Sequence, residues 1–204
     1  MPGSQNIFRP AKIAVIPTAG SVGTGEYQAG AIYSADGTVQ TPLVVADAAR
    51  LFNDALVKGL TDAGLMPVPL DSNPGDGKPP EGSDFILSSD LEQLEVNKRF
   101  GPNQTIHGQY FTMRSVVRVK YELRNRDGAA IYSGEITGTE NEPPNPVGAE
   151  VFLPLETDPA ESLSVALSRA VGQLMLQPAF RDALPTRTIA PTPASPPTPQ
   201  SPHP

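Results

Sequence analysis

The sequence predicts an α+β fold, with two helices packed on one face of a mostly antiparallel sheet of four to five strands and a disordered proline-rich C-terminal tail. Three observations predict it. Segments 43–63 and 160–176 repeat apolar residues every three and four positions, as amphipathic helices do. Residues 114–126 alternate apolar and polar side chains, as strands do. Prolines crowd the end of the chain, where little apolar surface remains to be buried.

Composition sets further bounds. A chain of 204 residues is long enough for one domain with a sizeable core. Its net charge of -7 repels polyanions, so we expect no nucleic-acid partner. The sequence contains no cysteine, which excludes disulfides, thiolate metal sites and a cysteine nucleophile. We expect a flexible N-terminus over 1–11, a single domain over 12–183 with a loop insertion at 18–42, and a disordered tail over 184–204.

The first elements follow from local patterns. Residues 12–17 form a short β-branched run that ends at a proline, and its continuous apolarity suits a strand covered on both faces. The glycine-rich segment 18–42 is expected to be a surface excursion that carries a small hairpin around Asp36 and Gly37. The helix predicted over 43–63 then covers one face of the sheet.

Gly64 follows this helix and supplies the left-handed backbone that ends many helices. Residues 66–70 resume strand character, but their two prolines cannot donate ladder hydrogen bonds. We therefore expect an edge strand there, followed by a loop over 71–83 and a strand over 84–96.

The next hairpin is the best-specified part of the sequence. Asp127 and Gly128 form a two-residue signal for a type I′ turn after the alternating strand 114–126. A turn of that kind fixes which residues face each other across the hairpin. The predicted pairs are Val119 with Ile136, Lys120 with Glu135, Tyr121 with Gly134, and Leu123 with Tyr132.

Residues 143–156 hold four prolines and are expected to form a loop, with a short strand possible at 151–153. Asp158 can cap the last helix, and Pro159 suits its first position. The apolar stripe of that helix is Leu163, Leu167, Ala170, Val171 and Leu174.

Candidate catalytic and metal-binding patterns all fail on inspection. The glycines of 20–25 match neither the dinucleotide pattern nor a P-loop. Residues 71–82 begin like a calcium loop, yet Asp76 and Gly82 occupy positions that need a glycine and a chelating glutamate. His107 lies far in sequence from the other histidine, His203. We therefore predict no catalytic, cofactor-binding or metal-ligating residue, and no enzyme activity.

One polar face stands out. Strand 114–126 carries a basic stripe, which Val116 and Glu122 interrupt: Arg114, Arg118, Lys120, Arg124 and Arg126. One interpretation is an exposed strand face with cross-strand ion pairs, such as Lys120 with Glu135. The other is a contact surface for an anionic ligand or a partner protein.

Several segments together resemble a known group of proteins: residues 12–17, 54–65, 83–87, 116–123, 127–134 and 166–171. They resemble the bacterial YajG-like and ABC-transport-auxiliary lipoprotein families over residues 12 to 176. The resemblance implies a fold like the N-terminal domain of TolB, a periplasmic or outer-membrane-associated location, and an accessory role in envelope complexes. The sequence departs from the group in lacking a lipobox cysteine, in the 18–42 insertion and in the proline-rich tail.

The leading hypothesis is a non-catalytic accessory or assembly protein of the bacterial cell envelope that binds another protein. The first residues lack the features of a signal peptide. Either the protein is cytosolic, or an export signal or anchor has been removed, in which case we expect peripheral association with the membrane. The alternative function is a ligand-binding module for an acidic glycan or lipid head group, contacted through the basic stripe.

Overall fold

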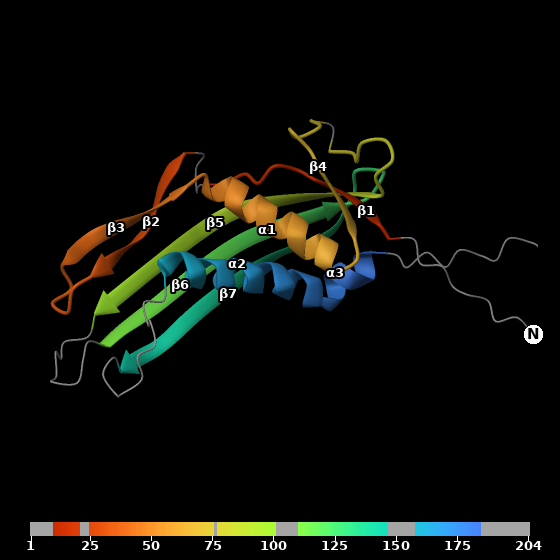
Figure 1. The fold of residues 1–204 in the computed structure, drawn as a ribbon. Coiled ribbons are helices and arrows are strands. Elements are labelled where there is room, and N and C mark those ends of the chain that lie inside the picture. The colour runs from red at the N-terminus through yellow and green to blue at the C-terminus, as the bar shows by residue number, and fades with distance from the viewer. Residues whose placement is uncertain (1–9, 21–24, 76, 101–109, 147–157, 185–204) are drawn as a thin grey trace, which may run out of the picture.

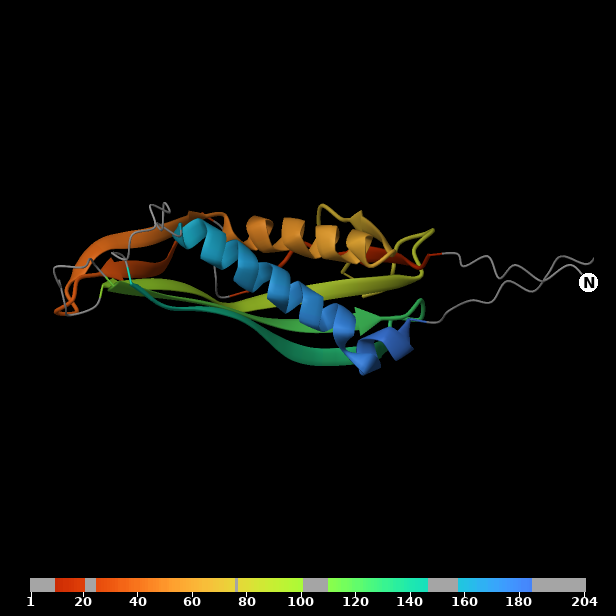
Figure 2. The same ribbon diagram turned by 60° about the horizontal axis from the view of Figure 1, so that its bottom comes forward.

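The computed structural model describes residues 10–20, 25–75, 77–100, 110–146 and 158–184. A seven-stranded sheet carries helices α1 and α2 on the same face (Figures 1 and 2). The elements in chain order are β1 Lys12–Val15, β2 Glu26–Tyr33, β3 Val39–Ala46, α1 Ala48–Asp62, β4 Met66–Pro69, β5 Phe85–Phe100, β6 Tyr110–Arg124, β7 Ala130–Pro146, α2 Pro159–Leu176 and α3 Pro178–Ala183.

Strand β5 is the centre of the sheet. One of its edges pairs antiparallel with β6, which pairs in turn with β7. The opposite edge is shared: β1 pairs parallel with the start of β5, where Ile13 lies beside Phe85, and β2 pairs parallel with its end, where Tyr33 lies beside Arg99. Strand β4 lies outside β1, and β3 lies outside β2.

This sheet is larger and more mixed than the four to five mostly antiparallel strands that the sequence predicts. Three of the six pairings between described strands are parallel, namely β1 with β4, β1 with β5, and β2 with β5. The predicted meander β5–β6–β7 and the edge position of β4 are both confirmed.

The small hairpin predicted within 18–42 is present as β2–β3, but it is longer than predicted and pairs with β5, so the description of the segment as a loop insertion was wrong. The turn of this hairpin lies at Asp36 and Gly37, as predicted. Gly37 has φ 86, and the Asp36 carboxylate accepts a hydrogen bond from Thr38 N at 2.9 Å. Strand β3 continues to Ala46, so α1 begins at Ala48 rather than at 43. Around Val44, exposed and half-buried side chains alternate, as they do in a strand. The sequence there is a continuous run of apolar residues, so this alternation could not be recognised from the sequence.

The β6–β7 register is the predicted one: Val119 faces Ile136, Lys120 faces Glu135 and Tyr121 faces Gly134. The predicted turn type was wrong. Asn125 N bonds Ala129 O and Gly128 N bonds Asn125 O, both at 3.0 Å, and Asp127 lacks the positive φ that a type I′ turn requires. A one-residue shift between Leu123 and Arg124 then restores the expected pairs.

Helix α2 matches its prediction. The Asp158 carboxylate accepts from Ala160 N at 2.9 Å, Pro159 starts the helix, and the predicted apolar stripe is buried. Strand β7 extends to Pro146, so residues 143–146 are not the start of a loop. The predicted strand at 151–153 and the proline-rich tail lie outside the described residues. No described helix has the length and apolarity needed to span a membrane.

Candidate functional site

An apolar groove of about 1130 Å³ runs between the two main helices. Its walls come from α1 and α2, and residues of β2, β3 and β5 close one side. The apolar lining residues include Leu43, Val45, Leu51, Val96, Leu163, Leu167 and Met175. Leu51 of α1 and Val44 of β3 remain 40% and 52% exposed, so part of the lining faces solvent.

One glycine sets the spacing of the helices along this groove. Gly59 of α1 lies directly against Val171 of α2, where a Cβ would overlap the Val171 Cγ1 atom. Gly172 also lines the groove, but a Cβ on Gly172 would meet no neighbouring atom of the described residues within 4 Å, so it does not set the spacing. Close approach at Gly59 therefore brings the helices together at one point, and both helices also contribute residues to the walls of the groove.

The ionisable residues of the groove are predominantly acidic. Asp54, Asp62 and Asp158 line it together with a single cation, Lys58. Lys58 pairs with Asp62 at 2.5 Å and Arg50 pairs with Asp54 at 3.9 Å, both on the exposed surface of α1. Asp158 takes part in none of the ion pairs between described residues, so the groove combines an apolar lining with a rim that carries one uncompensated carboxylate.

The basic stripe lies on the face of the sheet opposite the helices, and most of its cations have acidic partners. Arg118 pairs with Glu135 at 3.3 Å and Arg126 with Asp84 at 2.5 Å. Lys120 pairs with Glu92, and this hydrogen bond raises the pKa of Lys120. The first interpretation of the stripe, an exposed face with ion pairs, therefore describes these residues, although Glu135 pairs with Arg118 and not with Lys120 as named from the sequence.

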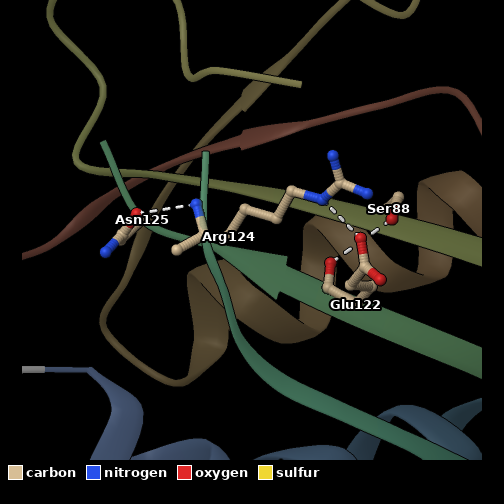
Figure 3. Close-up of polar contacts among 5 residues, drawn as sticks. Ser88, Glu122, Arg124 and Asn125 are labelled. Atoms are coloured by element: carbon tan, nitrogen blue, oxygen red, sulfur yellow. Dashed lines mark hydrogen bonds and ion pairs between the residues drawn. The ribbon is translucent and has the colours of Figure 1, made fainter. Parts of the chain in front are cut away.

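Arg124 is held in the same way. Its side chain turns back along β6 to the Glu122 carboxylate (Figure 3). The backbone carbonyl of Glu122 in turn accepts a hydrogen bond from Ser88 Oγ of β5 at 3.3 Å. Among the ion pairs between described residues, Arg114 takes part in none. Whether the five residues contact a ligand stays a prediction.

Sequence reasoning missed a neighbour of Arg114, namely Arg99, and the tyrosine ring that Arg99 contacts. Arg99 of β5 lies on the same outer face, and its Cζ atom is 5.0 Å from the centre of the Tyr33 ring. Tyr33 belongs to β2, which the sequence predicted only as one arm of a small hairpin in a surface excursion. No sequence signal placed that arm beside β5.

The other inspected patterns have structural explanations or lie outside the described residues. Gly20 has φ 143 and packs against the backbone of Leu91, where a Cβ would clash with the carbonyl oxygen. His107 is not among the described residues. In the described ranges, no three His, Asp or Glu side chains gather in a way that could hold a metal ion.

No family model and no curated protein matches the chain. Solved structures do resemble it. Protein XCC0632 from Xanthomonas campestris is 12% identical with a TM-score of 0.46, covering 88% of this chain and 87% of that one. A PelC dodecamer from Paraburkholderia phytofirmans is 18% identical with a TM-score of 0.43, covering 85% and 92%. Lipoprotein GNA1162 from Neisseria meningitidis is 14% identical with a TM-score of 0.39, covering 82% and 100%.

The solved structures that resemble this chain thus include a bacterial lipoprotein. Their TM-scores lie below 0.5, so we take no residue role, partner or location from them. The TolB-like fold implied by the sequence resemblance stays a prediction.

Proposed function

We propose that this chain is a non-catalytic accessory protein of the bacterial cell envelope, and that it binds another protein in the groove between α1 and α2. The open apolar groove is the observation that carries the proposal. A groove of about 1130 Å³ is at the upper end of ligand-pocket sizes, and its elongated walls suit a helix better than a small molecule.

The occupant that fits is the apolar face of an amphipathic helix with basic flanks. The exposed groove residues Leu51 and Val44 offer apolar contact. Asp54 and Asp62 have cationic partners in Arg50 and Lys58. Asp158 also lines the groove and forms no ion pair with a described residue, so a basic residue beside the apolar face of the partner gains an opposite charge there.

The envelope assignment rests on the sequence resemblance to YajG-like and transport-auxiliary lipoproteins. An accessory role needs a folded surface and no reactive centre, and the groove supplies such a surface. The groove forms only when the two helices pack side by side, so the sequence pattern of either helix alone does not reveal it.

A fluorescence experiment tests the groove directly. Since the sequence has no cysteine, Ser164→Cys places a single dye on the exposed wall of α2, and Ser133→Cys places it on the opposite face of the sheet as a control. The probes are two designed helical peptides with the same leucine face, one flanked by lysines and the other by glutamates. We expect the lysine peptide to change the emission at Ser164→Cys only, and the glutamate peptide to bind about tenfold more weakly or not at all.

Leu51→Asp provides the matched variant. Leu51 is 40% exposed, so the change should leave the melting temperature close to that of the parent protein while it introduces a charge into the apolar groove. Peptide binding should be lost. Equal responses at both dye positions, or unchanged peptide binding in Leu51→Asp, would overturn the proposed site.

A further inference from the structure

A second binding site is indicated on the outer face of the sheet, at the end where β2, β5 and β6 meet. Two exposed arginines, Arg99 of β5 and Arg114 of β6, occupy this end. Neither forms an ion pair with any residue that the structure describes. They contrast with Arg118, Lys120, Arg124 and Arg126 further along the same strand pair, which are each neutralised by a carboxylate.

The strand register brings the two arginines together. Arg99 lies opposite Thr112, and Asn97 lies opposite Arg114, with no register shift between these pairs. Arg99 and Arg114 are therefore diagonal neighbours on one face, with a separation of about 7–8 Å between their backbone positions. Long arginine side chains can converge on one group across that separation.

Arg99 is oriented by the aromatic ring beneath it. Its guanidinium carbon lies 5.0 Å from the Tyr33 ring centre, a cation–π distance. Stacking uses the flat face of the guanidinium and leaves its N–H edge available to a ligand. Tyr33 is held beside Arg99 by the parallel pairing of β2 with β5.

Glu95 of β5 lies diagonal to Arg114, on the side away from Arg99. Its carboxylate accepts hydrogen bonds from Gln93 Nε2 at 2.8 Å and from the Asn97 amide. The two guanidinium groups outnumber this carboxylate, so this end of the strand pair is locally positive in a chain whose net charge is -7.

We propose that Arg99 and Arg114 bind the dianionic phosphate of a phosphomonoester, with Tyr33 holding Arg99 in place. Two guanidinium forks offer several donors from two directions, and a tetrahedral phosphate has enough oxygens to accept from both. A single carboxylate has only two oxygens and one charge. The site is separate from the helix groove and does not depend on the proposed protein partner.

Two sources share this chemistry, a soluble phosphomonoester and the head group of phosphatidic acid in a membrane. Glycerol 3-phosphate, followed by calorimetry, tests the first source. Co-sedimentation with phosphatidylcholine vesicles that contain phosphatidic acid, compared with phosphatidylcholine alone, tests the second. Binding in either arm supports the site and identifies its source, and binding in neither arm overturns the proposal.

Variants separate the two arginines from general surface charge. Arg99→Gln and Arg114→Gln should each weaken binding at least about tenfold, as loss of a charge-assisted hydrogen bond does. Arg118→Gln removes the same charge from the same strand face, yet Arg118 is paired with Glu135, so its binding should change less than about twofold. Equal weakening in all three variants would show diffuse attraction along the basic stripe and overturn the two-arginine site.

Arg99→Lys and Tyr33→Leu probe the geometry. Lysine keeps the charge but loses the planar fork and its stacking, so Arg99→Lys should bind more weakly than the parent protein. Tyr33→Leu should weaken binding although it removes no charge. Full binding in both variants would contradict the assigned roles. All of these variants should retain the parent circular dichroism spectrum because Arg99 and Arg114 are exposed.

Discussion

Gly138 of β7 lies directly beneath Ala166 and Ala170 of α2. A Cβ at Gly138 would clash with the Ala166 carbonyl oxygen and would stand 2.6 Å from the Ala170 backbone nitrogen. The helix thus rests on the strand backbone, with no room for a side chain. We expect Gly138→Ala to lower the free energy of unfolding by about 2–4 kcal/mol, as overpacked core substitutions do, in chemical denaturation.

Gly172 of α2 is the matched control for that experiment. Among the described residues, no neighbouring atom lies within 4 Å of the position that a Cβ would take on Gly172, so alanine fits there without displacement. Alanine also favours the helix over glycine, and Gly172→Ala should raise the free energy of unfolding by up to about 1 kcal/mol. A similar loss of stability in both variants would contradict the close packing of α2 on β7.

A buried pair of hydroxyls links α2 to β6. Ser115 Oγ and Ser162 Oγ lie 2.8 Å apart and their residues are almost fully buried. Ser115→Ala leaves the other hydroxyl without this partner and should cost about 1–3 kcal/mol. The double variant removes both polar groups, so its loss should be smaller than the sum of the single losses. Additive effects in the double-mutant cycle would contradict the bond.

Tyr121 carries a buried hydroxyl without a hydrogen-bond partner among the described residues. Burial raises the pKa of Tyr121. The stability that comes from burying the neutral phenol is therefore complete below the ordinary pKa of 10.0 and is lost as pH rises toward the higher value in the folded state. Tyr121→Phe should match or exceed the parent in stability by up to about 1 kcal/mol at neutral pH.

The same substitution should reduce alkaline destabilisation. Thermal melts from about pH 8 to about pH 11, a range that brackets the ordinary tyrosine pKa, measure this effect in the parent and in Tyr121→Phe. A variant that is much less stable than the parent at neutral pH would reveal a hydrogen bond to the Tyr121 hydroxyl and refute the prediction.

The turn between β2 and β3 should respond to acid. A hydrogen bond from the Ser34 hydroxyl and another from Thr38 N lower the pKa of Asp36 from 3.8 to about 2. Because the folded-state pKa is depressed, the contribution of this carboxylate is present above pH 3.8 and is lost as pH falls toward 2. The carboxyl ¹³C signal of Asp36 should titrate near 2, and a midpoint near the ordinary value would show that the turn bonds do not persist in solution.

Local rules predicted the β6–β7 hairpin well because its signals lie close together in sequence. The register of Val119 with Ile136 follows from alternation around the turn, although the turn itself differs. Its Asn125 side chain accepts from Asp127 N and Ala129 N at 3.0 Å, which stabilises a longer turn with Gly128 alone at positive φ. Ile131 has no partner in the β6–β7 ladder, because Arg124 pairs with Ala130 and Leu123 pairs with Tyr132. This unpaired residue offsets the change of turn, so the pairs beyond it keep the predicted register.

The parallel pairings could not be predicted in the same way. The contact of Tyr33 with Arg99 depends on β2 and β5 meeting across 66 residues of chain, and no turn specifies it. The groove likewise depends on how the helices cross at Gly59 and Val171. A glycine inside an otherwise good helix pattern was the only hint, since it costs about 1 kcal/mol unless packing requires it.

The shared edge of β5 sets an order of events during synthesis. Strands β1 and β2 emerge first, yet both complete their ladders on a strand that ends at Phe100. Before β5 is present, β1 can pair only with β4, and β2 can pair only with β3. Such long-range closure slows folding. The nascent chain therefore passes through a long interval in which its first half remains open, and final closure waits for the arrival of one strand.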